Sequence, residues 1–541
     1  MDRRAYLGLV GVAAASLAGC LTREEPDIPE TPTDDEPTPE RTPEPTPEQT
    51  PEYPEGVNVV EDLGCDPTGR EPCAARIRQA LEDDIVLRFP SGTYRFEHRL
   101  RISQFSSVVM LGEGPVQLLP PEGYNNFLID VSEVGNFVFS GIDIDITAPE
   151  TTAGVRILTR DSFLVDDVEY IGRGNHPNQD VVHAMLLGLT TAEGRGVIRN
   201  FRAKKGSAIG HYKNGDGRGG ISIGPWNSGD IRIENCHLEE FGNNGIYASR
   251  TTGNIEVIGG TFRNNNVAGI RIAGEGSYVE GATVEVDLDS YTGPLTQLDS
   301  QFNTRGIVIE QGPTQKPAGA EIRNCTIVIE KTPQSKGGIY VFPTGRTVTV
   351  RDSTIRINAD NVPGVFRSPL ERQGQYRPPD GPSWVRLENV LITGTARGAS
   401  GIILADAPES VIRNCTIDQS GEQRDGVYLS NSNSTVVDGG SVTTTRYPYI
   451  IEFDGDSNTD PCLLQFDAVP EIRQSSARFD PGQSDSTVLI DGREYRANGG
   501  GVFSTSGCMT TDNLSSPTGD NTLAITGTQN GQLKWLRFVP E

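Results

Sequence analysis

Short hydrophobic runs recur through residues 220–445, and glycine, asparagine or aspartate separates each run from the next. Each round opens with a glycine and a β-branched residue, and the seven clearest openings are Gly220-Ile221, Gly245-Ile246, Gly269-Ile270, Gly306-Ile307, Gly338-Ile339, Gly401-Ile402 and Gly426-Val427. The first three glycines are 25 and 24 residues apart, which fits a coil of three short strands. The pattern therefore predicts an all-β solenoid whose coils bury their Ile and Val side chains.

A second apolar run follows each opening, and its middle holds a residue that tolerates a left-handed backbone. These residues are Asn235, Gly259, Gly281, Asn324, Asp352, Asn389, Asn414 and Gly439. All eight are Asn, Asp or Gly, the types that adopt positive φ at the lowest cost. The next position is mostly small, as at Cys236, Ala282 and Ser353. We call the eight residues the turn column and expect them to stack at one edge of the solenoid.

The solenoid pattern extends beyond its clearest repeats. Weaker copies occur at 137–142, 163–168 and 196–201, and the N-terminal region reads as a strand at 57–62 and an amphipathic helix at 72–83. The pattern fails from about residue 452. We therefore predict a parallel β-helix over residues 56–451 and a small β-rich C-terminal cap over residues 452–541.

The beginning of this region can be compared with a known family. It holds Asn58-Val59-Val60 with Asp62 and Gly64, then a covering helix, then Phe89-Pro90-Ser91-Gly92-Thr93-Tyr94, and strands closing on Leu111-Gly112-Glu113-Gly114. This order resembles the N-terminal region of pectate-lyase-like right-handed parallel β-helix proteins over about residues 57–114, and the repeats carry the resemblance to about residue 450. It implies the fold, with three-strand coils and a short capping helix. Function is less constrained, because that superfamily includes lyases, hydrolases, epimerases, phage tailspikes and non-catalytic surface proteins.

The first 55 residues read as an export signal followed by a spacer. Arg3-Arg4 ahead of an apolar run looks like a twin-arginine export signal, and Leu17-Ala18-Gly19-Cys20 resembles a lipobox in which Cys20 becomes lipidated. An ordinary cleaved signal is the alternative. Residues 21–55 are rich in Thr, Pro and Glu, a composition typical of a disordered stalk. We expect an extracellular protein whose only link to the membrane is the lipid anchor on Cys20.

Cysteine usage fits an exported protein. Cys236, Cys325 and Cys415 occupy the small position after the turn column, so we expect them to be buried apolar residues. The remaining four lie at the two ends, as Cys65 with Cys73 and Cys462 with Cys508. We predict two disulfides, one in each terminal cap.

The composition narrows the class of partner. Asp and Glu number 73 against 47 Lys and Arg, which gives a formal net charge of -26, and only seven of the basic residues are Lys. Such a surface stays soluble in high salt and repels phosphates, which argues against a nucleic-acid partner. We expect a halophilic, monomeric protein whose partner is an acidic polysaccharide or another cell-surface glycan.

Departures from the repeat are the best candidates for function. The spacing stretches at residues 171–181, 203–219, 287–305 and 359–384, each time at what reads as the same corner of the coil. Stacked corners place such loops along one side, where they are candidates for a binding groove or are merely tolerated insertions.

The first two loops hold most of the unusual chemistry. His176 and Asp180 lie in the first loop and His183 lies just after it. The second loop contributes His211, Tyr212, Lys213, Asp216 and Arg218. On a Lys-poor acidic chain, Lys213 and Arg218 make a cationic spot suited to an anionic sugar. A purely structural role, in which His211 and Asp216 bond within a glycine-rich loop, is the alternative.

A lyase acting on a uronic-acid polymer needs a cation, a base and an acid. Arg218, Lys213 or a bound Ca²⁺ could neutralise the sugar carboxylate, His211 or Lys213 could remove the C5 proton, and Tyr212 could protonate the leaving oxygen. An epimerase shares this proton abstraction. A glycoside hydrolase would instead need two carboxylates, for which Asp180 and Asp216 are the best pair. No cofactor is required by the sequence.

Other motifs leave the alternatives open. Arg367-Ser368-Pro369-Leu370-Glu371-Arg372 matches the Arg-x-Pro-x-x-Arg element of pectate lyases, so Arg367 and Arg372 are candidate substrate-binding residues together with His176, His183 and Trp226. The companion Asp-His element is missing, as is the Gly-His-Gly of polygalacturonases. Asn-Cys-Thr at Asn324 and Asn414 matches a glycosylation acceptor, although the turn column favours a structural role. A polysaccharide lyase is our main hypothesis, and a non-catalytic glycan-binding or structural surface protein is the alternative.

Overall fold

We describe the fold from a computed structural model. The structure describes residues 53–178, 183–207, 217–294, 303–311, 316–374 and 376–452, and beyond these a set of strands between 464 and 537. All of them belong to one compact unit, Tyr53–Glu541. The predicted signal and stalk, including Cys20, lie outside the described residues.

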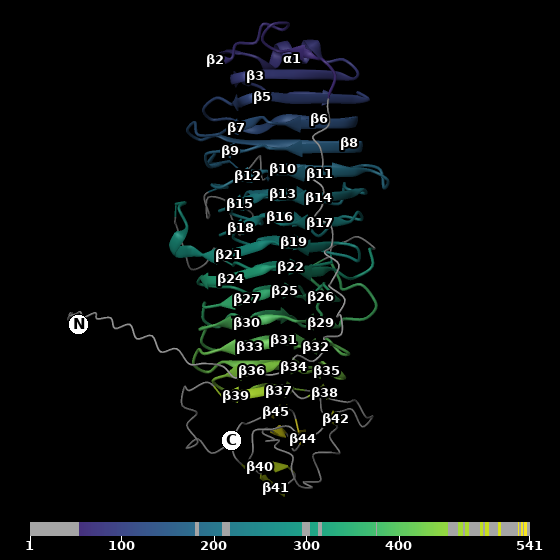
Figure 1. Ribbon diagram of the computed structural model, residues 1–541, viewed down its shortest axis with the longest axis vertical. Helices are drawn as coiled ribbons and strands as arrows, with labels where there is room; N and C mark the ends of the chain where they lie inside the picture. Colours follow the sequence, from purple (N-terminus) through teal and green to yellow (C-terminus); the bar gives the residue numbers. More distant parts are fainter. Residues whose placement is uncertain are drawn as a thin grey trace, which may run out of the picture. The chain divides into compact units, whose positions relative to one another are not determined.

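The strands of this unit stack in three parallel columns, as the all-β solenoid predicts (Figure 1). The first column, which starts with the Gly-Ile openings, consists of β10 (His183–Leu189), β13 (Gly219–Ile223), β16 (Ile246–Ala248), β19 (Ile270–Ile272), β22 (Ile307–Ile309), β25 (Ile339–Val341), β28 (Val365–Arg367), β31 (Ser400–Ala405), β34 (Asp425–Ser430) and β37 (Tyr449–Glu452). Each strand pairs in parallel with the next strand of its column. The fold is a parallel β-helix, and parallel crossovers of this kind are right-handed.

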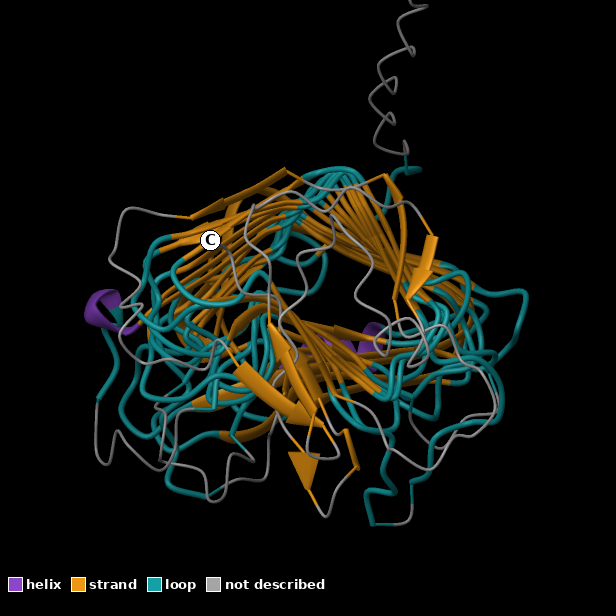
Figure 2. Ribbon diagram, turned by 90° about the horizontal axis from the view of Figure 1, so that it is seen from below, coloured by secondary structure: helices purple, strands orange, loops and turns teal. Residues whose placement is uncertain are grey.

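The other two columns complete each coil. The second consists of β11 (Arg195–Arg199), β14 (Asp230–Glu234), β17 (Ile255–Ile258), β20 (Tyr278–Glu280), β23 (Glu321–Arg323), β26 (Val348–Arg351), β29 (Val385–Glu388), β32 (Val411–Arg413), β35 (Thr435–Asp438) and β38 (Leu464–Ala468). The third consists of β12 (Arg202–Ala203), β15 (His237–Glu239), β18 (Thr261–Arg263), β21 (Thr283–Asp287), β24 (Thr326–Lys331), β27 (Thr354–Ile357), β30 (Leu391–Gly394), β33 (Thr416–Gln419), β36 (Ser441–Thr444) and β39 (Glu471–Gln474). Seen along the stack, the strands surround the interior and the loops gather at the corners (Figure 2).

The first coils use longer strands that pass a corner without interruption. These are β3 (Ile85–Arg95), β5 (Ser107–Leu119), β6 (Asn125–Ser140) and β8 (Thr152–Asp166), with the short strands β4 (Leu100–Ser103), β7 (Asp143–Asp145) and β9 (Tyr170–Ile171) between them. Because β8 pairs with both β10 and β11, it feeds the first and the second column at once. The weaker repeats of the sequence are therefore true coils of the same stack.

The turn column confirms the sequence pattern residue by residue. All eight positions have positive φ, from 49° at Asn235 and Asn414 to 66° at Gly439, and each joins a second-column strand to a third-column strand. An ordinary L-residue would lose roughly 1–2 kcal/mol there, which explains why only Asn, Asp and Gly occur. The upstream repeats have the same turn at Gly141, Asp167 and Asn200.

Small side chains follow the turn column because that position faces the interior. Cys236, Cys325 and Cys415 are buried and free of disulfides, as expected. Burial raises the pKa of the Cys236 thiol to about 12, so it stays protonated. At the opening glycines the neighbouring coil approaches too closely for a side chain, since a Cβ at Gly245 would lie 2.6 Å from the Gly269 carbonyl oxygen.

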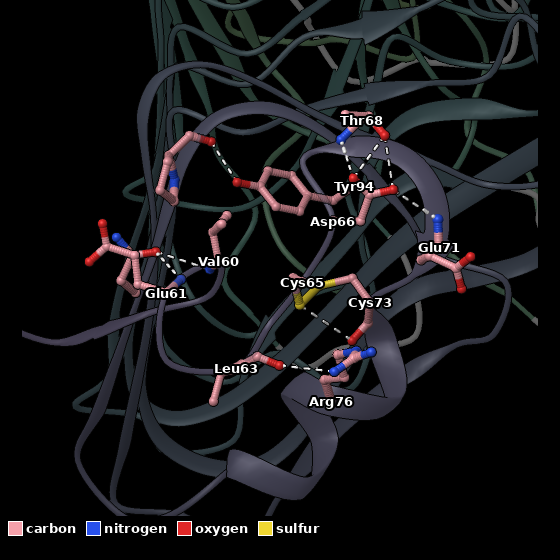
Figure 3. Close-up of a disulfide and its surroundings, with 12 residues drawn as sticks. Val60, Glu61, Leu63, Cys65, Asp66, Thr68, Glu71, Cys73, Arg76 and Tyr94 are labelled. Carbon is pink, nitrogen blue, oxygen red and sulfur yellow. Dashed lines mark hydrogen bonds between the residues drawn. A yellow bond between two sulfur atoms is a disulfide. The ribbon is translucent and has the colours of Figure 1, made fainter.

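The N-terminal end is closed by one short helix and a disulfide. Helix α1 (Ala74–Ala80) is shorter than the predicted 72–83 and buries Ala74 and Ile77. Around it lie β1 (Val57–Asn58) and β2 (Thr68–Pro72). Cys73, just ahead of the helix, bonds to Cys65, which confirms the first predicted disulfide (Figure 3).

The C-terminal end differs from the expected boundary at residue 451. Parallel pairing continues into β38 and β39, so a further partial coil follows β37. Antiparallel strands β42 (Gly507–Met509) and β45 (Trp535–Arg537) then pair with β38 and β37. The remaining strands form two hairpins, β40 (Thr487–Ile490) with β41 (Arg493–Arg496), and β43 (Thr528–Gln529) with β44 (Gln532–Leu533). Cys462 lies outside the described residues, so its disulfide with Cys508 stays a prediction.

Three of the four expected corner loops do gather on one side. Arg173 of the first loop donates to the Ser207 carbonyl oxygen of the second loop at 2.8 Å and to Thr292 Oγ1 of the third loop at 3.1 Å. A 3₁₀ helix, η2 (Leu288–Ser290), begins that third loop. Contact between loops this far apart in sequence follows from the parallel stack.

The prediction of a single fourth corner loop at residues 359–384 is wrong. Strand β28 interrupts it, because Gly364-Val365 is a further opening of the repeat that the spacing concealed. The long insertion is residues 368–384, which lie at a different corner, between first-column strand β28 and second-column strand β29. We call this segment the strap.

Among the described residues, no helix is long and apolar enough to cross a membrane.

Candidate functional site

Outward-facing residues of the first column form one continuous line along the stack. The line consists of Ser222, Tyr247, Arg271, Val308, Tyr340, Phe366, Ile403, Tyr428 and Ile450, each in register with the next. Their neighbours on each strand are buried in the core, so alternation turns these nine outward. We call them the outer column.

A buried ion pair lies near the middle of the outer column. Arg271 Nε donates to Glu310 Oε2 at 2.6 Å, and Ser249 Oγ donates to the same oxygen at 2.6 Å. Only 3% of the Glu310 side chain is exposed. Burial alone would raise the pKa of Glu310, but the charge and hydrogen bonds of Arg271 outweigh it and hold that pKa below its usual range. Glu310 is therefore ionised and fixes the position of Arg271.

Aromatic rings and further arginines surround this pair. The Arg250 guanidinium lies 5.4 Å from the Tyr247 ring centre and 4.4 Å from that of Tyr376, and its Nη1 donates to the Tyr376 hydroxyl at 2.9 Å. Arg305 lies 5.4 Å from the Tyr340 ring centre. Stacked guanidinium and aromatic groups hold each other in one orientation. We call Tyr247, Arg250, Arg271, Arg305, Glu310 and Tyr340 the central cluster.

The central cluster is cationic on a strongly acidic chain. It has three arginines against one carboxylate, a formal charge of +2, whereas the whole chain has -26. Within the part of the chain that the structure describes, the buried Nε atoms of Arg250 and Arg305 have no hydrogen-bond partner. Burial lowers the pKa of Arg305 to about 10, which still leaves it charged at neutral pH. The cluster therefore keeps a net positive charge at neutral pH.

An open pocket adjoins the central cluster on the C-terminal side. It has a volume of about 410 Å³ and is lined by Phe366, Pro369, Ser400, Ile403, Ala405, Tyr428 and Ser430. The ring centres of Tyr340 and Phe366 are 5.4 Å apart, so the aromatic surface continues from the cluster into the pocket. Apolar surface with a few hydroxyl groups suits the face of a sugar ring.

The strap connects the two ends of this surface. Glu371 of the strap donates its backbone N–H to the Pro343 carbonyl oxygen at 3.1 Å, one coil back. Tyr376 reaches further, to Arg250, which is 126 residues away in sequence. The strand register places that arginine four coils before the strap begins, roughly 19 Å along the stack at about 4.8 Å per strand. The strap thus borders the central cluster.

Of the candidates in the second loop, the structure describes Arg218. Its side chain is buried, its Nη2 donates to the Ala153 carbonyl oxygen at 2.5 Å, and its guanidinium lies 5.6 Å from the Tyr170 ring centre. His183 lies close to Arg218. Burial and the charge of Arg218 lower the pKa of His183 to about 4. His183 is therefore neutral at neutral pH. His211, Tyr212, Lys213, Asp216 and Asp180 lie outside the described residues.

The remaining candidates lie in separate places. His176 accepts a hydrogen bond from the Asn178 backbone N–H through Nδ1 at 3.0 Å. Trp226 is 38% exposed and donates from Nε1 to the Leu187 carbonyl oxygen at 2.9 Å, beside the first column. Arg367 is fully buried, whereas Arg372 is exposed, and no contact joins the two arginines among the described residues. The structure also describes no group of three or more His, Cys, Asp or Glu residues that could hold a metal ion.

The sequence reasoning missed the outer column, although a signal for it was present. Except for Ile450, each outward residue is the second one after the opening glycine, as in Gly245-Ile246-Tyr247 and Gly338-Ile339-Tyr340. Because strand side chains alternate, a buried Ile after the glycine implies that the next residue faces outward. Comparing that third position across the repeats would have shown the concentration of aromatic residues.

No protein-family model and no curated protein matches this chain. Among solved structures, it is similar to PfbA, a surface adhesin of Streptococcus pneumoniae, with 11% identity over 82% of this chain and 99% of that one, and a TM-score of 0.39. The A-module of the Azotobacter vinelandii mannuronan C-5 epimerase AlgE6 has 15% identity over 70% of this chain and 98% of that one, with a TM-score of 0.38. A tailspike protein mutant of E. coli bacteriophage HK620, in complex with a pentasaccharide, has 11% identity over 80% and 77%, with a TM-score of 0.40.

Proposed function

We propose that this protein binds an acidic polysaccharide along the outer column of its first sheet. The observation that carries the proposal is the joining of a cationic central cluster to an open aromatic pocket on one face. Tyr428 and Phe366 offer rings to the apolar faces of sugars, and the positive charge of Arg250 and Arg305 attracts their carboxylate or sulfate groups.

The length of the surface favours a polymer over a small molecule. From Tyr247 to Tyr428 the outer column crosses seven strands, which at about 4.8 Å between neighbours spans roughly 29 Å. The partly exposed positions along this distance are Tyr247, Arg271, Phe366, Ile403 and Tyr428. A linear acidic glycan lying parallel to the stack would pass over them in turn.

Binding should depend on the charge of the polymer. Immobilised acidic polymers, a polyuronate and a sulfated glycan, should retain the protein, and a neutral glucan of similar length should not. Added salt should weaken the retention partly, because the buried arginines are screened less than exposed ones. Equal retention on the neutral glucan would contradict the proposal.

We further propose that the protein cleaves the polysaccharide by β-elimination. One observation that favours it is the neutral His183 imidazole beside the buried Arg218, because Arg218 belongs to the second loop, which also holds His211, Tyr212 and Lys213. In this proposal His211 or Lys213 removes the C5 proton, Tyr212 protonates the leaving oxygen, and Lys213 or a bound Ca²⁺ favours the charged intermediate, because the Arg218 side chain is buried away from a substrate. Incubation with acidic polymers should then produce an unsaturated product that absorbs in the ultraviolet. Retention without that product would identify a non-catalytic binder.

Display at the cell surface is part of the same proposal. The predicted lipid on Cys20 and the Thr-Pro-Glu-rich segment 21–55 would hold the β-helix outside the cell, where acidic polysaccharides are found. Cell fractionation of the native protein and of a Cys20→Ser variant tests this directly, because only the native form should stay with the membrane.

A further inference from the structure

Two asparagines of the turn column differ from the others in one respect. Asn324 is followed by Cys325-Thr326 and Asn414 by Cys415-Thr416, so both lie in the Asn-x-Thr acceptor pattern for N-linked glycans. Asn235 and Asn389 occupy the same column but are followed by His237 and Leu391 at the second position. All four have φ between 49° and 54°. The left-handed turn therefore accounts for the asparagine at all four positions. Threonine is also common two residues later, as at Thr261, Thr283 and Thr354, so the acceptor pattern forms where the two residue types coincide.

The coil geometry presents the acceptor pattern on the outside. Asn324 is exposed, Cys325 is buried, and Thr326 is exposed at the start of β24. Asn414 is exposed in the same way, with Cys415 buried and Thr416 half-buried at the start of β33. Alternation across the turn thus places the amide and the hydroxyl on the same outer edge.

The two amides are also free to react. Within the described part of the chain, no side-chain hydrogen bond engages the Nδ2 atom of Asn324 or Asn414. In contrast, Asn389 Nδ2 donates to Asp352 Oδ1 at 2.9 Å, and Asn200 Nδ2 donates to Asp166 Oδ1 at 3.0 Å. The amide is engaged where an aspartate lies one coil before it, and the two acceptor asparagines have no such neighbour.

A third occurrence of the pattern supplies an internal contrast. In Asn433-Ser434-Thr435 the threonine is fully buried, and its Oγ1 donates to the Ser432 carbonyl oxygen at 2.6 Å. Asn433 itself is half-buried. A transferase that reads the threonine hydroxyl could not reach it in the folded protein. A related acceptor pattern with serine, Asn513-Leu514-Ser515, lies outside the described residues.

We propose that Asn324 and Asn414 are sites of N-linked glycosylation on the exported, folded protein. In this reaction the Asn Nδ2 atom forms a bond to the anomeric carbon of a glycan carried on a lipid-linked phosphate. The bond from that carbon to the phosphate oxygen breaks, the phosphate leaves with the electron pair, and the amide proton passes to a base of the transferase. The proposal requires the predicted export but not the polysaccharide site.

The position of the two sites is compatible with ligand binding. The turn column lies between the second and the third column of strands, at an edge that the first column does not share. Glycans attached there would leave the outer column accessible. They would also add bulk and hydration to an exposed edge of the stack.

The test is site-resolved mass spectrometry of the protein isolated from its native cells. Peptides with Asn324 and Asn414 should carry a glycan mass, and peptides with Asn235, Asn389 and Asn433 should be unmodified. Full recovery of unmodified Asn324 and Asn414 peptides would overturn the proposal, as would a glycan on Asn433.

Matched variants separate modification from folding. Thr326→Val keeps the β-branched shape on the strand surface and removes the hydroxyl, so the glycan at Asn324 should be lost and that at Asn414 retained. Thr354→Val, the same position in a coil without the acceptor pattern, should change neither site. Polysaccharide binding should be the same in all three proteins. A glycan that persists on Asn324 in Thr326→Val would contradict the proposed recognition of the hydroxyl.

Discussion

The buried pair of Arg271 and Glu310 gives the sharpest stability prediction. Glu310 accepts hydrogen bonds from Arg271 and Ser249, and the Glu310 and Arg271 side chains are only 3% and 13% exposed. Replacing Glu310 with leucine removes the carboxylate and leaves the Arg271 guanidinium buried without its counter-charge. Uncompensated buried charges of this kind destabilise proteins by about 3–5 kcal/mol.

The double variant Arg271→Met/Glu310→Leu should recover most of this loss. Both charges are then absent, and an apolar pair of similar volume is often as stable as the ion pair it replaces. We expect the free energy of unfolding of the double variant to lie within about 1–2 kcal/mol of the parent.

Urea unfolding followed by far-ultraviolet circular dichroism measures both variants against the parent. The slope of each transition should be compared as well, because a repeat stack can lose cooperativity. A loss below about 1 kcal/mol for Glu310→Leu would show that water reaches the pair. The central cluster would then not be a preformed, desolvated site.

The same pair predicts a pH dependence with a defined sign. The pKa of Glu310 is lower in the folded chain than in the unfolded chain. Its contribution to stability is therefore present above the unfolded pKa and is lost as the pH falls through the folded pKa. The parent should lose stability faster than the double variant on acidification, and parallel curves would refute the assignment.

Three further predictions concern the turn column, the cap and the strap. Asn389→Ala should cost about 1 kcal/mol relative to Asn389→Gly, because only glycine adopts the φ of 54° without strain, and paired urea titrations measure the difference. Removing the disulfide with Cys65→Ser/Cys73→Ser should cost about 2–3 kcal/mol for a loop of this length, seen as earlier proteolysis of the N-terminal cap; unchanged proteolysis would contradict its role. Tyr376→Ala should make the strap more sensitive to limited proteolysis, whereas Tyr376→Phe, which keeps the ring over Arg250, should stay close to the parent.

Much of the fold could be predicted from the sequence because the backbone restricts residue type at particular positions. A turn with positive φ favours Asn, Asp or Gly, as at Asn324, Asp352 and Gly439. The turn column can therefore be recognised from the residue types at one repeated position. The buried position after each opening glycine is equally restricted, to Ile or Val. Stacked coils repeat both restrictions, which is why the architecture is confirmed. The first disulfide could be predicted for a different reason, because Cys65 and Cys73 lie close together in the sequence and outside the repeat.

The candidate site could not be predicted in the same way, because an outward position accepts almost any side chain. Ser222, Tyr247, Arg271 and Val308 follow one another in the outer column and share no residue type. The contact between Arg250 and Tyr376 joins residues 126 positions apart, which no local pattern specifies. The sequence drew attention to histidines and charged residues in loops, whereas the structure brings the arginines together with aromatic strand residues.

The central claim is that the outer column of the first sheet binds an acidic polysaccharide. Its most direct test is the dissociation constant of an acidic oligosaccharide for the parent and for Phe366→Ala/Tyr428→Ala, which removes two rings from the pocket. The control is Tyr278→Ala, since Tyr278 is an outward tyrosine of the second column with Arg323 4.5 Å from its ring centre. At about 1 kcal/mol or more for each ring, the double variant should bind at least roughly tenfold more weakly, while the control is unchanged. Equal affinity in all three proteins, or a loss confined to Tyr278→Ala, would contradict the claim.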